Sequence, residues 1–178
     1  MSYILGFAGS NSSTSINYKL VRYTASLINE QELRVLDMAN YPFPMYSEDY
    51  EKEHGFSNSL VEFKEEIKKA SGIILSVNEH NSNPSAYFKN IIDWLSRVDK
   101  DFIREQKLFL MATSGGKRGA QSSLAVTEKV LLRFGAEISG TFSLPGFYDN
   151  FDLEKGILDT QLAAEHSEKL GAFLDSIR

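Results

Sequence analysis

The sequence predicts an α/β fold in which a doubly wound parallel sheet carries helices on both faces. Five short apolar segments, each about as long as one strand, alternate with segments whose apolar residues recur at helical spacing. No internal repeat interrupts this alternation. A chain of 178 residues forms most simply one domain, so we expect a single domain over residues 1–178.

The five strands are predicted from short apolar runs that are bounded by small or polar residues. The first run, YILGFAG at residues 3–9, ends at a glycine, and the third, GIILSV at residues 72–77, has the β-branched content of a strand covered on both faces. The other runs are ELRVLDM at residues 32–38, KLFLMAT at residues 107–113 and EISGTFSL at residues 137–144.

The helices are predicted from apolar residues that line one face at helical spacing. In chain order these residues are Ile16, Leu20, Tyr23 and Leu27; Leu60, Phe63, Ile67 and Ala70; Phe88, Ile91, Ile92 and Leu95; Leu124, Val130, Leu131 and Phe134; and Leu162, Leu170, Phe173 and Ile177. Between residues 39 and 56 we expect an irregular segment with a solvated charged run, because Pro42 and Pro44 forbid a helix.

Composition excludes several classes of function. A net charge of -5 and a pI near 5.3 argue against a nucleic-acid partner, which requires a basic field. The chain has no cysteine, and its scattered histidines His54, His80 and His166 form no metal cluster. No segment has the length and apolarity of a membrane span or the pattern of a signal peptide. We therefore expect a cytoplasmic protein with neither a metal nor a membrane partner.

Three loops follow the first, third and fourth predicted strands, at residues 9–17, 78–90 and 113–123. Each loop ends a strand, opens a helix and is rich in small or amide side chains. In a doubly wound sheet, ligands bind beyond the carboxyl ends of the strands, near the point where strand order reverses. We expect these three loops to form one ligand site.

The first loop favours an anion. All six residues from Ser10 to Ser15 are Ser, Thr or Asn, and the free N–H groups of a helix N-terminus follow them. Ser10, Ser15 and Asn17 are the natural donors, although Ser15 or Thr14 can also serve simply as a helix cap. The loop has neither the glycine spacing of a dinucleotide fingerprint nor the lysine of a Walker loop.

The three loops together resemble the NAD(P)H-dependent FMN reductases, a flavodoxin-like family. Gly9, Ser10, Ser15 and Asn17 match the family motif G-S-x-R-x-x-S-x-N, whereas Ser12 occupies the place of its arginine. The second loop resembles P-E-Y-N followed by L-K-N-x-x-D-W, with matches at Glu79, Asn81, Lys89, Asn90, Asp93 and Trp94 and departures at Asn78, His80 and Phe88. The third loop, SGGKRG, resembles a glycine-rich turn of the family.

This resemblance implies a five-stranded sheet of order 2-1-3-4-5 that binds FMN. The flavin phosphate would contact Ser10, Ser12, Ser15, Ile16 and Asn17; the ring edge would contact Asn78, Glu79, His80 and Asn81; and Ser114, Gly115 and Gly116 would approach the ring from the other side. NADPH or NADH would pass hydride to FMN, and a flavin, quinone or similar acceptor would receive it in a ping-pong cycle. The family resemblance also implies a homodimer or homotetramer with no catalytic acid–base pair.

The departures from the family motifs leave some functional questions open. Ser12 offers phosphate a neutral hydrogen bond in place of a charge-assisted one, so the choice between NADPH and NADH stays open. Lys117 and Arg118 can supply compensating charge or can be solvated turn residues. His80 can titrate near the flavin or contribute only its backbone. His166, on the apolar face of the last helix, is expected in the core or at an interface rather than at a ligand.

The aromatic segment from Tyr41 to Tyr46 and the nearby Trp94 fit either a subunit interface, which we favour for the segment, or packing within the domain. Two other functions remain as alternatives. One is a flavodoxin-type carrier that binds FMN without using a nicotinamide, although this chain lacks the T-x-T-G-x-T loop of dedicated flavodoxins. The other is a relative that has kept the fold and lost FMN.

Overall fold

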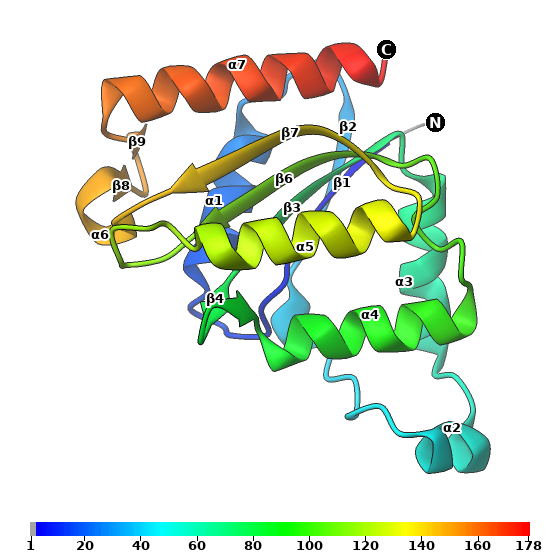
Figure 1. Ribbon diagram of the computed structural model, residues 1–178. Helices are drawn as coiled ribbons and strands as arrows, with labels where there is room; N and C mark the ends of the chain where they lie inside the picture. The colour runs from blue at the N-terminus through cyan, green and yellow to red at the C-terminus, as the bar shows by residue number, and fades with distance from the viewer. Residues whose placement is uncertain (1–2) are drawn as a thin grey trace.

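The computed structural model describes residues 3–178 and contains the predicted parallel sheet. Its strands lie in the order β2-β1-β3-β6-β7 (Figure 1). They are β1 (Tyr3–Ala8), β2 (Glu32–Leu36), β3 (Gly72–Val77), β6 (Lys107–Thr113) and β7 (Glu137–Leu144). Counted along the chain, this is the order 2-1-3-4-5, and all neighbouring strands are parallel, so the fold prediction is confirmed.

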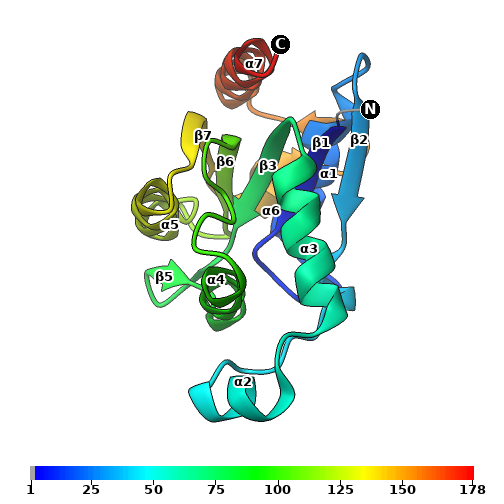
Figure 2. The same ribbon diagram turned by 90° about the vertical axis from the view of Figure 1, so that its right-hand side faces the viewer.

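Helices cover both faces of this sheet (Figures 1 and 2). One face carries α1 (Ile16–Ser26) and α7 (Thr160–Ser176), whereas the other carries α3 (Asn58–Lys69), α4 (Ala86–Val98) and α5 (Gln121–Arg133). Both faces of β1 and β3 are therefore removed from water, which explains why their sequences read as continuous apolar runs rather than as an alternation.

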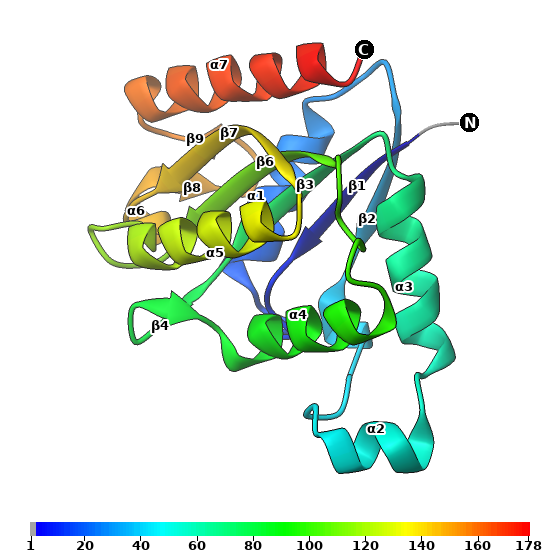
Figure 3. The same cartoon turned by 45° about the vertical axis from the view of Figure 1, so that its right-hand side comes forward.

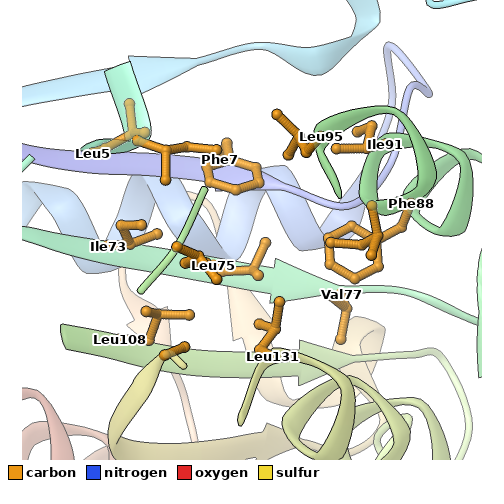
Figure 4. Packing of buried hydrophobic residues seen from close by; sticks show 14 of the residues in the cluster. Leu5, Phe7, Ile73, Leu75, Val77, Phe88, Ile91, Leu95, Leu108 and Leu131 are labelled. Atoms are coloured by element: carbon orange, nitrogen blue, oxygen red, sulfur yellow. The ribbon is translucent and has the colours of Figure 1, made fainter. Parts of the chain in front are cut away.

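Side chains of successive strand residues enter the two cores alternately. Leu5 and Phe7 of β1 pack toward α3 and α4, whereas Ile4 packs toward α1 and α7. Figure 4 shows Phe7 and Leu75 packed among side chains of α4 and α5. Burial of each such Leu, Ile or Phe side chain stabilises the fold by about 1.5–3 kcal/mol, so these runs fix the sheet in register.

The segment between β2 and α3 is more regular than expected. It contains the 3-10 helix η1 (Met38–Asn40) and the short helix α2 (Glu48–His54), which lies apart from the sheet (Figure 2). The expectation of an irregular segment throughout is therefore wrong. Pro42 and Pro44 precede α2 and do not interrupt it. The Ser47 Oγ caps it by accepting from the Tyr50 N–H at 3.1 Å.

Several short elements at the carboxyl edge of the sheet were not predicted. β4 (Glu79–His80) and β5 (Asn83–Pro84) form a hairpin after β3. Its two turn residues, Asn81 and Ser82, both have positive φ angles of 53° and 63°, as in a type I′ turn. α6 (Phe147–Asn150) and a second hairpin, β8 (Phe151–Asp152) and β9 (Gly156–Ile157), follow β7.

His166 lies in the core, which is one of the two places, core or interface, where it was expected. Its side chain is 1% exposed, and its Nε2 lies 2.9 Å from the Thr24 Oγ1. The rings of Phe109 and Phe142 also contact it. Burial lowers the pKa of His166 to about 4, so the folded chain accommodates the neutral imidazole.

The segment from Tyr41 to Tyr46 is fastened to α4 of its own chain. The Trp94 Nε1–H donates to the Pro44 carbonyl at 2.7 Å, and Asn90 accepts from the Tyr46 N–H at 2.7 Å. Trp94 is only 2% exposed. Its packing within the chain is therefore established, while Met45, which is 69% exposed, projects into solvent.

Within residues 3–178, no helix is both long enough and apolar enough to traverse a lipid bilayer. The cytoplasmic location stays a prediction.

Candidate functional site

The three predicted site loops meet at the carboxyl edge of the sheet, where β4 and the N-terminal ends of α4 and α5 lie (Figure 3). Hydrogen bonds join them in pairs. The Ser85 Oγ–H donates to the Gly9 carbonyl at 2.8 Å, which links the second loop to the first. The Ser123 Oγ–H donates to the Asn78 carbonyl at 2.7 Å, which links the third to the second. The site is thus one connected unit.

The first loop presents unpaired donors at the N-terminus of α1. Ser15 is the N-cap, and its Oγ accepts from the Tyr18 N–H at 3.2 Å, which leaves its hydroxyl hydrogen free to donate. The N–H groups of Ile16 and Asn17 find no acceptor among residues 3–178. Because the helix dipole adds positive potential here, the loop suits a phosphate-like anion.

Hydrogen bonds to serine hydroxyls shape the rest of the first loop beside the N-terminus of α1. The Ser12 N–H donates to the Ser10 Oγ, and the Thr14 N–H donates to the Ser12 Oγ, both at 3.3 Å. Ser10 is nearly buried, whereas Ser12 is exposed. Ser12 therefore stands on the open rim, where a longer cationic side chain would have room to reach an anion.

The side chain of Asn17 is directed into the protein rather than into the loop. Its Nδ2–H donates to the Thr113 carbonyl at 3.1 Å, and its Oδ1 accepts from the Thr113 N–H at 3.0 Å and the Ser76 Oγ–H at 2.7 Å. It thereby ties α1 to β3 and β6 beneath the loops. Its backbone N–H, which has no acceptor within residues 3–178, is the group left for a ligand.

Gly9 allows the first loop to pack directly on α4. A Cβ atom at this position would lie 2.8 Å from the Phe88 ring, closer than real Cβ contacts come. The glycine of the first motif therefore serves loop packing, and it brings the first loop against the helix that the second loop opens.

The second loop is the β4–β5 hairpin, and Glu79 anchors it to α5. The N-cap of α5, Ala120, is left-handed, with a φ of 63°, and has no side-chain cap. The Glu79 Oε2 accepts instead from the Ser123 N–H in the first turn of α5, at 3.0 Å. The carboxylate thus replaces the missing cap across two loops.

Asn78 directly precedes this hairpin, and His80 is the second residue of its first strand. The Asn78 Nδ2 lies 3.4 Å from the His80 Nε2, and His80 is exposed. The Asn78 Oδ1 is buried and has no hydrogen-bond partner within residues 3–178. A buried acceptor without a partner favours binding of a molecule that can donate a hydrogen bond to it.

Within the third loop, residues 114–116 are hydrogen-bonded to the turn that follows β7. The Ser114 carbonyl accepts from the Phe147 N–H at 3.0 Å, and the Gly116 carbonyl accepts from the Gly146 N–H at 2.9 Å. Gly115 and Gly116 are exposed, so a flat ligand can approach their backbone closely. Lys117 and Arg118, next in the loop, are also exposed and form no ion pair among residues 3–178.

Tyr148 lies at the rim of the site and was not predicted from the sequence. It is 76% exposed, and a Cβ on Gly115 would lie 3.0 Å from its ring. An aromatic residue shortly after Pro145 and Gly146, just beyond the last predicted strand, was the available signal. Its ring lies at the rim of the third loop.

These features fit FMN, the cofactor that the resemblance implies. The α1 N-terminus with its unpaired N–H groups suits the phosphate, and the exposed glycine backbone suits a planar ring. The orphaned Asn78 Oδ1 adds an acceptor at the hairpin.

Comparison with known proteins gives consistent results. The family model for NADPH-dependent FMN reductase matches residues 2–149. An uncharacterised protein (MG342 homolog) of Mycoplasma pneumoniae is 27% identical over 156 residues, which cover 85% of this chain and 92% of that protein. An NADPH:quinone oxidoreductase of Arabidopsis thaliana is 25% identical, with 88% and 82% of the two chains covered.

Among solved structures, the flavoenzyme FerB, an NAD(P)H:acceptor oxidoreductase from Paracoccus denitrificans, has the same fold. Its TM-score is 0.79 at 22% identity, with 99% of this chain and 97% of that chain covered. With the matched loops and the sheet order, the family match establishes that this chain is an oxidoreductase of the NADPH-dependent FMN reductase family, which uses FMN with NAD(P)H as electron donor.

Proposed function

We propose that this chain holds FMN at the three loops and passes hydride from NAD(P)H to a flavin, a quinone or a related small acceptor. The observation that carries the proposal is the N-terminus of α1, whose N–H groups at Ile16 and Asn17 have no acceptor within residues 3–178 and are ringed by serine hydroxyls. The two other loops are hydrogen-bonded to this point or to each other.

In this proposal the first loop holds the phosphate. Ser10, Ser12 and Ser15 donate from their hydroxyls, and Ile16 and Asn17 donate from their backbone. The absence of a cation in this set makes the contact weaker than a bidentate arginine would, because a neutral hydrogen bond contributes about half as much as a charge-assisted one.

The second and third loops hold the ring. The backbone of Asn78, Glu79, His80 and Asn81 lies along one edge, while Ser114, Gly115 and Gly116 approach the ring from the other side. When bound, FMN supplies the hydride chemistry, accepting from the nicotinamide and returning to the acceptor in a ping-pong cycle. The chain's own contribution is to bind, to orient and to keep one face open.

We further propose that the chain forms a homodimer or a homotetramer through the 41–46 segment and α4. Met45 is 69% exposed, and an apolar groove between α4 and α5 is lined by Phe88, Ile92 and Val126. Apolar surface of this kind marks protein interfaces. A mass of 20.0 kDa by light scattering, that of one chain, would contradict this assembly.

FMN binding is tested by the visible spectrum of the purified protein and by fluorescence titration with FMN. We expect either bound flavin absorbance or quenching that saturates at one FMN per chain. Colourless protein that leaves FMN fluorescence unchanged would instead favour a relative that has kept the fold and lost the cofactor.

A further inference from the structure

A charged groove runs along the outer side of α1, between that helix and the β8–β9 hairpin. Its volume is about 580 Å³, within the range of small-molecule and cofactor sites. Lys19 and Arg22 line it from α1, and Lys155 faces them from the hairpin; Glu154 is the acidic residue in the lining. Lys19 and Arg22 lie three positions apart, so they share one face of the helix.

No direct salt bridge engages these cations among the described residues, although Asp152 and Glu154 lie beside Lys155 on the hairpin. Lys19, Arg22 and Lys155 form no ion pair among residues 3–178. On the α3–α4 side the pattern differs, since Lys68 lies 2.6 Å from Asp99 and Arg97 lies 3.0 Å from Glu51. In a chain with a net charge of -5, unpaired cations that line one groove mark a place where an anion is attracted.

The walls of the groove are fixed by packing. Gly156, with a φ of 76°, lies against Tyr23, where a Cβ would be 2.1 Å from the ring. The Phe151 ring meets the Tyr23 ring edge-to-face at 5.5 Å. The Asp152 Oδ1 accepts from the backbone N–H groups of Glu154 and Lys155, both at 2.9 Å, so it shapes the turn that presents Lys155.

The groove begins about one helical turn from the phosphate loop. Lys19 follows the N-cap Ser15 by about one helical turn, a rise of about 6 Å along α1. In Figure 1 the β8–β9 hairpin lies at the end of the molecule toward which the strand arrows point, near α6. An extended ligand with one end at the loops can therefore place its other end in the groove.

We propose that this groove binds the phosphate-bearing adenosine end of the pyridine nucleotide and favours NADPH through its 2′-phosphate. The inference rests on the proposed function, which makes a pyridine nucleotide the substrate. Arg22 and Lys155 donate to phosphate oxygens, and the Tyr23 and Phe151 rings offer the adenosine an apolar wall. The site supplies the cationic contact that Ser12, in place of the family arginine, does not give.

The direct test uses adenosine 2′,5′-bisphosphate as the probe, titrated by calorimetry into the FMN-loaded protein at low salt. We expect Arg22→Ala and Lys155→Ala each to weaken its binding about fivefold, the effect of losing one partly exposed ion pair. Binding of adenosine 5′-monophosphate should weaken less. Lys100→Ala removes an exposed cation far from the groove and should change neither affinity.

Two results would overturn the proposal. One is wild-type protein that does not bind the bisphosphate; the other is unchanged binding in the groove variants with a loss in Lys117→Ala/Arg118→Ala, which would assign the phosphate to the third loop. The probe carries no nicotinamide and cannot reduce the flavin, so its affinity reports on the groove alone. Failure of the flavin to bind or to be reduced tests the proposed function separately.

Discussion

The Glu79 carboxylate accepts a hydrogen bond from the backbone N–H of Ser123 at 3.0 Å, across two loops that are far apart in the sequence. This bond caps a helix that has no cap of its own, and it holds the hairpin in place beside the glycine loop. A residue matched to the family as a site residue thus acts through its side chain on the protein and leaves its backbone to the proposed ligand.

Replacing Glu79 should therefore affect both stability and FMN affinity. We expect Glu79→Ala to lower the free energy of unfolding by about 1 kcal/mol, as the loss of a helix cap does. FMN should also bind more weakly, because the hairpin loses its anchor. Urea unfolding and fluorescence titration measure the two effects, with Glu62→Ala, an exposed glutamate of α3, as the control. Unchanged FMN affinity in a destabilised Glu79→Ala protein would contradict the role of Glu79 in positioning the hairpin.

Asn17 should be among the least replaceable residues near the site. Its amide makes three buried hydrogen bonds to Thr113 and Ser76, so Asn17→Ala leaves their polar atoms without partners. We expect a loss of about 3 kcal/mol in unfolding free energy. Asn29→Ala, at an exposed position, should leave the free energy of unfolding almost unchanged. A loss of under about 1 kcal/mol for Asn17→Ala would show that α1 is not held to the sheet in this way.

Introducing the arginine that the family has at position 12 tests where the phosphate lies. Ser12 is exposed on the rim of the first loop, so Ser12→Arg can add a charge-assisted contact without disturbing the core. We expect FMN to bind about fivefold to tenfold more tightly. The neighbouring Ser13→Arg is the matched control, since it adds the same charge at another exposed position. Equal gains in both variants would indicate only a general charge effect.

Because His166 is buried, we expect the folded chain to lose stability in mild acid. Its pKa is about 4 in the folded chain and near 6.5 when unfolded, so the unfolded chain takes up the proton first as the pH falls. The contribution of neutral His166 to the free energy of unfolding is fully present above pH 6.5. It is lost between pH 6.5 and 4, by about 3 kcal/mol at most. In urea unfolding across this range, His166→Gln should show a shallower pH dependence, whereas exposed His54→Gln should follow the wild type. Parallel curves for all three proteins would contradict this role.

The centre of the sheet could be predicted from the sequence because β1, β3 and β6 are buried on both faces. Runs such as residues 72–77, in which every residue is buried, are typical of a strand that is covered on both faces. The short helix α2 was missed because it buries no residue, so its sequence has no apolar periodicity. The β4–β5 hairpin was missed because its strands have two residues each, too few for an alternation to appear.

The site was predicted only as a set of loops. The alternation of strands and helices placed the three loops at the carboxyl edge, but the direction of each side chain depends on tertiary neighbours. Asn17 points inward because Thr113 and Ser76 lie beneath it, and those residues are distant in the sequence. Tyr148 reaches Gly115 only because the turn after β7 folds back on the third loop. The first relationship has no local sequence signal, and the second has only an aromatic residue shortly after Pro145 and Gly146.

The most direct measurement of the central claim is anaerobic reduction of the FMN-loaded protein by NADH or NADPH, followed by addition of a quinone or free flavin. We expect flavin absorbance to bleach on addition of at least one of the two nucleotides, and to return when the acceptor is added. Flavin that stays oxidised for minutes with both nucleotides, yet bleaches with dithionite, would contradict the reductase function and favour an electron carrier.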